Sequence, residues 1–231
     1  MESEERRDLA LEHLSYLAQA LVEAGREQEG IATFARAAAR REDSEDFAEE
    51  EADFSRSLVQ RHRNDDALAF AQRALTELAG AERQLQADEA LGVQALCKAR
   101  RGDAAGAVAD ATTSLAAKEH FLGERSILIP LLARGEALLA LRRAPDALVD
   151  LERALAIADA TKGDLAIRAD IRFATARALV ETRRDPERAV ALATRAGGEL
   201  ETAGLPDAAN AARRWLARNG TASIAALAPN H

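Results

Sequence analysis

Residues Gly135–Leu155, with the sequence GEALLALRRAPDALVDLERAL, contain the pattern that decides the fold. Two amphipathic segments meet there at a short turn. In the second segment Leu148, Leu151 and Leu155 recur three and four residues apart, which places them on one face of a helix. Pro145 fits the first turn of that helix, because its missing N–H would have no partner there in any case. The stretch therefore predicts two helices joined by a turn.

The same pattern of small and bulky residues recurs along the chain. The small residue near the start of each second helix occupies five positions: Gly30, Ala67, Ala107, Ala147 and Ala189. Subtraction gives spacings of 37, 40, 40 and 42 residues between them. A nearly constant period of this length is typical of a solenoid, in which each unit stacks on the next. The sequence thus predicts an all-α fold of five helix pairs, and no run of residues predicts a strand.

Composition and charge narrow the classes of protein. Hydrophobic residues make up 48% of the 231 residues, which is enough for a substantial core, but aromatic residues make up only 3%. The net charge of −8 argues against a general binder of nucleic acid or of an anionic membrane, since both need a basic surface. The charged start has no secretory signal, and no apolar run is long enough to span a bilayer. With the single Cys97, these features predict a soluble cytoplasmic protein.

We expect one continuous domain over residues 1–231, because no linker rich in Gly, Ser and Pro divides the chain. Gly25 predicts the end of the first helix, and Asn64 and Asp185 are expected to cap later helices. The expected repeats cover residues 8–41, 45–80, 86–118, 123–162 and 164–204. A capping helix over residues 207–219 carries Trp215, which we expect to cover the open end of the fifth pair. The tail, residues 220–231, is weakly determined.

The most acidic stretch, Arg40–Asp53, allows two interpretations. Its carboxylates could form a cation site from Glu49, Glu50, Glu51 and Asp53. Alternatively, they lie in solvent at the start of a helix, where negative charge favours the positive end of the helix dipole. We favour the second interpretation, because adjacent residues on a helix point in different directions.

The segment Gly102–Ser114, GDAAGAVADATTS, resembles the turn and second helix of a tetratricopeptide (TPR) repeat. The family pattern is a glycine, a small residue five positions later, a bulky residue four further and an alanine three beyond. Gly25, Gly30, Phe34 and Ala37 fit this pattern. The resemblance covers about residues 9–204 and implies a right-handed α-solenoid of about five TPR-like repeats with a C-terminal capping helix. The period here is longer than the family's, which is about 34 residues.

A second resemblance concerns the last third of the chain. The segment Ile171–Ala196 is similar to the repeat tails of large bacterial signalling proteins, in which the repeats follow a serine/threonine kinase domain. The chain itself has no glycine-rich loop and no HRD or DFG sequence. This resemblance implies a signalling context rather than kinase activity.

No pattern in the sequence points to catalysis or to a metal. The four histidines, which we expect to be exposed, have neither the HExxH motif nor a second ligand at suitable spacing: His13, His62, His120 and His231. Cys97 lies within an expected helix and is interpreted as a buried structural thiol. Walker, GxSxG and Rossmann motifs are missing. We therefore expect a non-enzymatic protein without a cofactor.

The resemblance also implies a binding surface, because first helices line the concave groove in this family and second helices form the outer wall. The expected partner-binding residues are Gln19, Arg56, Gln60, Arg100, Leu132, Glu136, Leu139 and Arg177. Leu132 and Leu139 are expected to supply apolar contact, while the polar side chains orient a partner. The Lys and Asn residues with which some members clamp a carboxylate are missing here. On the outer wall, we expect Arg73 and Glu152 to face water.

Two functional hypotheses follow. The chain is either an adaptor that binds a peptide or helix of another protein in the concave groove, or a structural subunit that assembles with itself or a larger complex. A regulatory role beside a signalling kinase is a further alternative. An exposed apolar face at one end would favour assembly, and a groove of mixed charge favours the adaptor.

Overall fold

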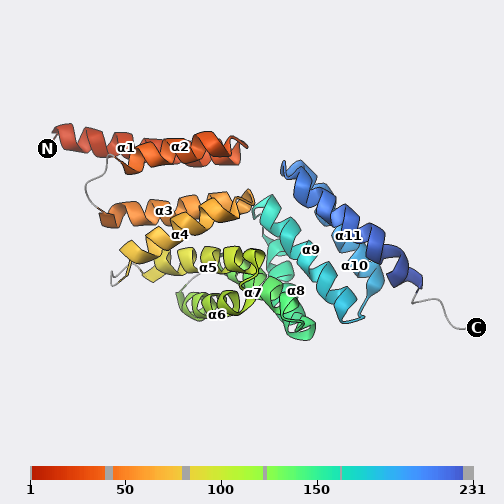
Figure 1. Cartoon of the computed structure of the whole chain (residues 1–231). Helices are drawn as coiled ribbons and strands as arrows, with labels where there is room; N and C mark the ends of the chain where they lie inside the picture. Colours follow the sequence, from red (N-terminus) through yellow and green to blue (C-terminus); the bar gives the residue numbers. More distant parts are fainter. Residues whose placement is uncertain (1, 40–43, 80–83, 122–123, 162, 226–231) are drawn as a thin grey trace, which may run out of the picture.

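The structure is a computed structural model that describes residues 2–39, 44–79, 84–121, 124–161 and 163–225 of the chain (Figure 1). These residues form α-helices and one short 3₁₀ helix, with no strand in the ranges described. The helices of the first three pairs are α1 (Glu2–Glu23), α2 (Glu27–Ala38), α3 (Ser44–Gln60), α4 (Asn64–Glu77), α5 (Gln84–Arg101) and α6 (Ala104–Phe121). The remaining elements are η1 (Glu124–Ile127), α7 (Leu128–Ala140), α8 (Ala144–Ala160), α9 (Leu165–Glu181), α10 (Pro186–Thr202) and α11 (Pro206–Ala225).

The helices form a stack of five antiparallel pairs that follows the order of the sequence (Figure 1). We call α1, α3, α5, α7 and α9 the first helices and α2, α4, α6, α8 and α10 the second helices. The first helices α3, α5, α7 and α9 pack on one another in succession, and α4, α6 and α8 each also contact the first helix that follows. The additional helix α11 packs on α10 at the C-terminal end. The expectation of an all-helical solenoid is thus confirmed.

The turn inside every helix pair has the same backbone structure. Its central residue has a positive φ: Gly25 (77°), His62 (58°), Gly102 (94°), Arg142 (62°) and Arg183 (55°). At each turn this residue and the next donate backbone hydrogen bonds to carbonyls three and five residues earlier, as in Gly25 N–Val22 O (3.0 Å) and Arg26 N–Leu21 O (2.8 Å). This arrangement, the Schellman motif, satisfies carbonyls that the end of a helix would leave unpaired. The turn therefore repeats even where glycine is replaced.

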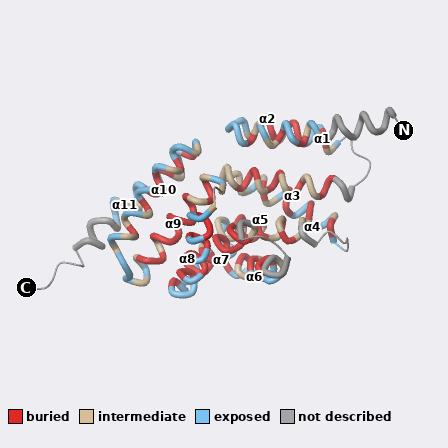
Figure 2. The backbone as a smooth tube through the Cα atoms, turned by 180° about the vertical axis from the view of Figure 1, so that it is seen from behind, coloured by how far each residue is buried: buried red, intermediate tan, exposed pale blue. Residues whose placement is uncertain are grey.

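The core runs through the whole stack, and Figure 2 shows its buried residues concentrated where α5, α7, α8 and α9 meet. Small side chains let the helices approach closely: Ala95, Ala147 and Ala154 are fully buried. Four of the eight aromatic residues are gathered between the first two pairs. Phe34 stacks on Phe54 with ring centroids 4.2 Å apart, and further rings complete that cluster at Phe47 and Phe70.

Helix ends agree with the sequence in some places and differ in others. Asp185 caps α10, because its carboxylate accepts the N–H of Arg188 at 3.0 Å. The expectation that Asn64 caps α4 is wrong, because the helix already begins at that residue and its side chain accepts a hydrogen bond from Arg100 instead. The expected long first helix of the fourth pair is split into η1 and α7, with Pro130 in the first turn of α7.

The C-terminal helix continues beyond its expected end. α11 runs to Ala225 rather than to residue 219, and residues 226–231 of the expected tail lie outside the described residues. Trp215 contacts Phe173 of α9 edge to face, with ring centroids 5.7 Å apart. An aromatic pair of this geometry adds to the stabilisation that burial provides. Trp215 thereby joins α11 to the fifth pair.

Candidate functional site

The first helices do not form an open groove along their whole length, because the turn after α3 contacts α9. His62, in the turn after α3, lies with its Nε2 atom 2.9 Å from Oδ2 of Asp170 in α9. Arg100, at the end of α5, donates a hydrogen bond to the same oxygen at 2.6 Å. These contacts join the second pair of helices to the fifth. The stack is therefore curved strongly enough to bring its own surface together.

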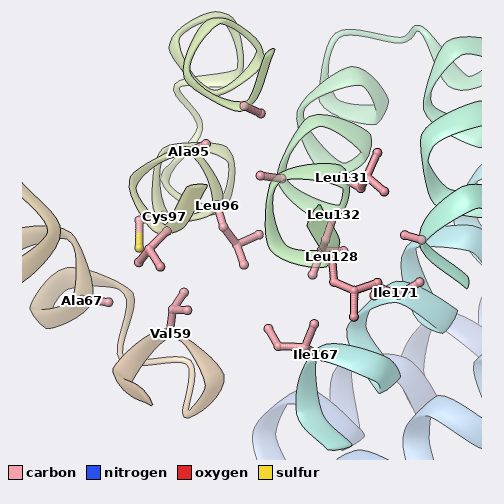
Figure 3. Packing of buried hydrophobic residues seen from close by; sticks show 14 of the residues in the cluster. Val59, Ala67, Ala95, Leu96, Cys97, Leu128, Leu131, Leu132, Ile167 and Ile171 are labelled. Atoms are coloured by element: carbon pink, nitrogen blue, oxygen red, sulfur yellow. The ribbon is translucent and has the colours of Figure 1, made fainter. Parts of the chain in front are cut away.

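Apolar side chains fill the space between the helices at this point. Val59 of α3, Leu96 of α5 and Leu132 of α7 are fully buried, and Ile167 and Ile171 of α9 lie in the same cluster. Figure 3 shows these side chains directed into the region enclosed by the four first helices. We call these five residues the closed centre. The expectation that Leu132 and Leu139 contact a partner is wrong, because they are only 0% and 2% exposed and belong to the core.

An ion cluster lies beside the closed centre and consists of His62, Asn64, Arg100, Glu136 and Asp170. Arg100 is the hub, with Nη1 3.2 Å from Oδ1 of Asn64 and Nε 3.6 Å from a carboxylate oxygen of Glu136. Burial alone would raise the pKa of Asp170, but the charge of Arg100 and the hydrogen bond with His62 outweigh it and lower that pKa. The pKa of Glu136 is raised, because burial outweighs its attraction to Arg100. Arg100 and Glu136 thus already have partners inside the molecule.

A second set of contacts lies at the same ends of the helices as the ion cluster. Arg61 precedes His62 and hydrogen-bonds to the carbonyls of Ala203 and, at 3.4 Å, Gly204, which lie in the turn between α10 and α11. Its Nε is also 3.2 Å from a carboxylate oxygen of Glu27 at the start of α2. The turn after α3 therefore contacts both the first helix pair and the turn between α10 and α11. Figure 1 shows the start of α2 close to that turn.

The other end of the first helices remains accessible. Tyr16 of α1 is 59% exposed, and its hydroxyl donates a hydrogen bond to a carboxylate oxygen of Glu12, one turn earlier, at 3.3 Å. The side chain of Arg56, 40% exposed, pairs with Asp53 at 2.7 Å and with Glu89 of α5. We call Tyr16, Asp53, Arg56 and Glu89 the open strip.

The open strip and the ion cluster share one side of α5. Glu89 and Arg100 are eleven residues, or about three helical turns, apart, and so they lie on the same face. The first-helix surface is therefore open at the Glu89 end of α5 and closed at the Arg100 end. It is not one continuous groove.

The structure brings together only some of the residues expected to bind a partner. Arg100 and Glu136 lie in the ion cluster, and the half-buried Arg177 is near enough for its charge to act on Glu136. Arg56 belongs to the open strip, while Gln19 and Gln60 are half-buried on α1 and α3. Leu17, which shares the first helix with them, is 50% exposed.

Two important residues, His62 and Asp170, were not among the expected site residues. The expectation that His62 is exposed is wrong, because it is half-buried and paired with Asp170. One signal was present in the sequence: His62 occupies the turn position that glycine holds at residues 25 and 102. A bulky residue with a positive φ is uncommon and deserves a search for a partner. Asp170 has no comparable signal, because the contact depends on how the whole stack curves.

The charges expected to face water on the outer wall also have partners. Arg73 of α4 forms an ion pair with Glu51 of α3, whose side chain is fully buried. Burial raises the pKa of Glu51 to about 7, although the charge of Arg73 partly offsets it. Glu152 of α8 accepts two hydrogen bonds from Arg188 of α10, at 2.6 and 2.7 Å. Arg73 is therefore exposed, as expected, although it also pairs with Glu51, whereas Glu152 is only half-exposed and is held by Arg188.

The described residues show no obvious centre for chemistry. No three of their His, Cys, Asp and Glu side chains are grouped as metal ligands would be, and this includes the acidic start of α3 from residue 47. Cys97 is fully buried, and burial raises the pKa of its thiol to about 12, as expected of a structural thiol. In the part of the chain that the structure covers, no helix is both long and apolar enough to cross a membrane.

Comparison with known proteins supports the fold. No family model and no curated protein sequence matches the chain. Solved structures do: the "nearly identical TPR-like repeats" of a putative kinesin light chain from Podosopora anserina match with a TM-score of 0.57 and 18% identity, over 84% of this chain and 96% of that one. A variant of the same protein gives a TM-score of 0.58 over 84% and 95% of the two chains, again with 18% identity. At this identity the likeness concerns the fold alone, and the chain has a TPR-like repeat fold.

Proposed function

We propose that this protein is a non-enzymatic scaffold that binds a segment of another protein along the open strip. Repeat solenoids of this kind generally serve protein–protein interaction, which gives the proposal its class of partner. The observation that carries it is the ion-paired set of Asp53, Arg56 and Glu89 across α3 and α5, together with the exposed Tyr16 on the neighbouring helix α1. Tyrosine and arginine are the side chains that most often anchor protein interfaces.

The open strip has room for a partner because its side chains are still accessible. Gln19 lies three residues after Tyr16, and Gln60 lies four residues after Arg56, so each extends the strip along its own helix. Arg100 and Glu136 have a different role in this proposal: they hold the closed centre and so determine where the strip ends. The likeness of residues 171–196 to bacterial kinase-associated tails extends the proposal to a cytoplasmic signalling assembly.

The test compares three immobilised forms of the protein: wild type, Tyr16→Ala/Arg56→Ala, and Arg36→Ala. Arg36 is a suitable control, because it is exposed on the second helix α2 and has no side-chain partner among the residues described. Proteins captured from native lysate are quantified by mass spectrometry. A partner of the open strip is retained by wild type and the control and reduced at least about tenfold by the double variant. Equal recovery on all three forms contradicts the proposal.

Self-assembly is the second candidate function, and one observation favours it. Tyr16 and Leu17 are neighbours on α1, and both have large side chains. Tyr16 is 59% exposed and Leu17 is 50% exposed. Exposed apolar patches at the end of a repeat stack are a common site of association. Sedimentation velocity distinguishes the two functions: a concentration-dependent dimer that Tyr16→Ala/Leu17→Ala abolishes supports assembly, and a monomer at all concentrations excludes it.

A further inference from the structure

A separate groove lies between α8 and the turn that joins α9 to α10. Its volume is about 320 Å³ and it opens to solvent. Leu148 and Leu179 are buried beneath it, while Val149 at its edge is 71% exposed, the highest value among the large apolar residues described. None of its lining residues belongs to the open strip or the closed centre. The groove is therefore a distinct feature of the second-helix side of the molecule.

The charged residues of the groove are not equally satisfied. Glu152 and Arg188 neutralise one another through two hydrogen bonds, at 2.6 and 2.7 Å. Asp185 accepts the N–H of Arg188 at 3.0 Å and so caps α10. Arg184 also lines the groove, but its exposed side chain makes no hydrogen bond or ion pair with any residue that the structure describes. The lining thus carries two positive and two negative charges, and Arg184 is the one charged residue among them without a hydrogen bond or ion pair to a described residue.

The neighbouring turns add positive charge outside the groove. Arg142 and Arg183 occupy the central positions of the turns after α7 and α9, and both are exposed without a side-chain partner in the described ranges. Arg143, by contrast, is paired with Asp146 at 2.8 Å. Exposed carboxylates also occur nearby, at Glu181 and Glu187, but neither lines the groove. Within the groove itself, Arg184 is the charged residue that forms no hydrogen bond or ion pair with a described residue.

We propose that this groove binds a short acidic segment of a partner protein. An aliphatic side chain of the segment enters the space above Leu148 and Leu179 and contacts Val149, and a neighbouring carboxylate pairs with Arg184. Ligand pockets begin at about 300 Å³, so the volume suits one such side chain and a few backbone atoms. An arginine guanidinium pairs with a carboxylate through two parallel hydrogen bonds, which favours an acidic over a neutral or basic segment. This surface is independent of the open strip, so the scaffold would hold two segments at once.

The test uses methyl-labelled full-length protein and a defined probe, the capped hexapeptide Ser-Leu-Glu-Asp-Leu-Ser. A matched peptide carries Gln and Asn in place of Glu and Asp. We expect saturable shifts of the Val149, Leu148 and Leu179 methyl signals with the acidic peptide, and at least about tenfold weaker binding of the amide peptide. We also expect Arg184→Glu to weaken binding of the acidic peptide by at least about tenfold. Val149→Asn should weaken it by about threefold. The control Arg36→Glu carries the same charge change and should bind as wild type does.

Each other outcome overturns the proposal. These are equal binding of the two peptides, unchanged binding by Arg184→Glu, and methyl shifts that avoid the groove. The Tyr16→Ala/Arg56→Ala variant separates this proposal from the proposed function: it should bind the acidic peptide normally. Loss of peptide binding in that variant would place the peptide on the open strip and would also overturn the assignment to the groove.

Discussion

Glu51 shows at the scale of a single residue how burial and charge oppose one another. Its side chain is fully buried between α3 and α4 and paired with the half-exposed Arg73. The pKa of Glu51 is raised to about 7, because burial penalises the carboxylate more than Arg73 favours it. The folded state therefore binds a proton more tightly at this residue than the unfolded state does. Stability from this group is fully present below the ordinary pKa of glutamate and is lost as the pH rises to about 7.

The first prediction concerns Glu51→Gln, which cannot ionise. Between pH 4.5 and 8 the free energy of unfolding should fall in wild type relative to the variant by up to about 3 kcal/mol, because each pKa unit corresponds to about 1.4 kcal/mol. Urea unfolding across this pH range measures the difference. Glu181→Gln, at an exposed position on α9, serves as the control and should follow wild type. Parallel pH profiles for wild type and Glu51→Gln would show that the pKa of Glu51 is the same in the folded and unfolded states, and would contradict the prediction.

At the scale of the element, the turn after each first helix combines a shared backbone with different side chains. Arg142 has a φ of 62° and no side-chain partner among the described residues, so its left-handed backbone brings only strain. His62 has a φ of 58°, but its ring pairs with Asp170. The same replacement by glycine should therefore have opposite effects at the two turns.

The second prediction is that Arg142→Gly raises the free energy of unfolding by up to about 1 kcal/mol, after the greater freedom of glycine in the unfolded chain is deducted. His62→Gly relieves the same strain but loses the interaction with the charged partner Asp170. Such an interaction contributes about 1.5–3 kcal/mol, so this variant should have a lower free energy of unfolding than wild type. Urea unfolding at neutral pH compares both variants with wild type. Stabilisation by both replacements would mean that the His62–Asp170 pair contributes nothing.

In the fourth pair, Gly135 of α7 lies directly against the large side chain of Leu151 in α8. A Cβ atom placed on Gly135 of α7 would lie only 2.6 Å from side-chain atoms of Leu151 in α8. Leu151 is itself fully buried. The absence of a side chain at one position thus makes room for the leucine at the other, and their effects should be coupled.

The third prediction follows from that contact. Leu151→Ala should destabilise by about 2–5 kcal/mol through the cavity it leaves. Gly135→Ala should cost about 1–3 kcal/mol through overpacking. The double variant should be more stable than the sum of the two predicts, because the new methyl group occupies part of the space vacated by the leucine. Strictly additive values in a double-mutant cycle would show that the two residues do not touch.

At the scale of the whole molecule, the sequence predicts the repeats well and their curvature poorly. The spacing of residues such as Ala107 and Ala147 reports contacts within a pair and between successive pairs, and these recur in the structure. Asp185 with Pro186 likewise predicts the start of α10, because capping is local chemistry. Contacts of this kind depend on residues close in sequence or on one neighbouring unit.

The closed centre could not be predicted in this way. The contact between His62 and Asp170 joins residues 108 positions apart, and it arises from small rotations added up over three successive units. Leu132 illustrates the consequence, since the family's groove position is a core position in this structure. The polar residues differ among themselves: Arg100 and Glu136 are largely buried in the ion cluster, whereas Arg56 stays accessible at the open end of the first helices.

The most direct test of the account is whether α3 and α9 touch in solution. Val59 and Ile167 each lie three residues, about one helical turn, before His62 and Asp170, so their methyl groups should meet when that pair forms. With selectively labelled Val, Leu and Ile methyl groups, NMR cross-peaks between Leu96 of α5 and Leu132 of α7 serve as the positive control, since those helices pack directly. The account predicts a through-space cross-peak between the methyl groups of Val59 and Ile167. Its absence, with the control cross-peak present, would contradict the closed centre and restore a continuous groove along the first helices.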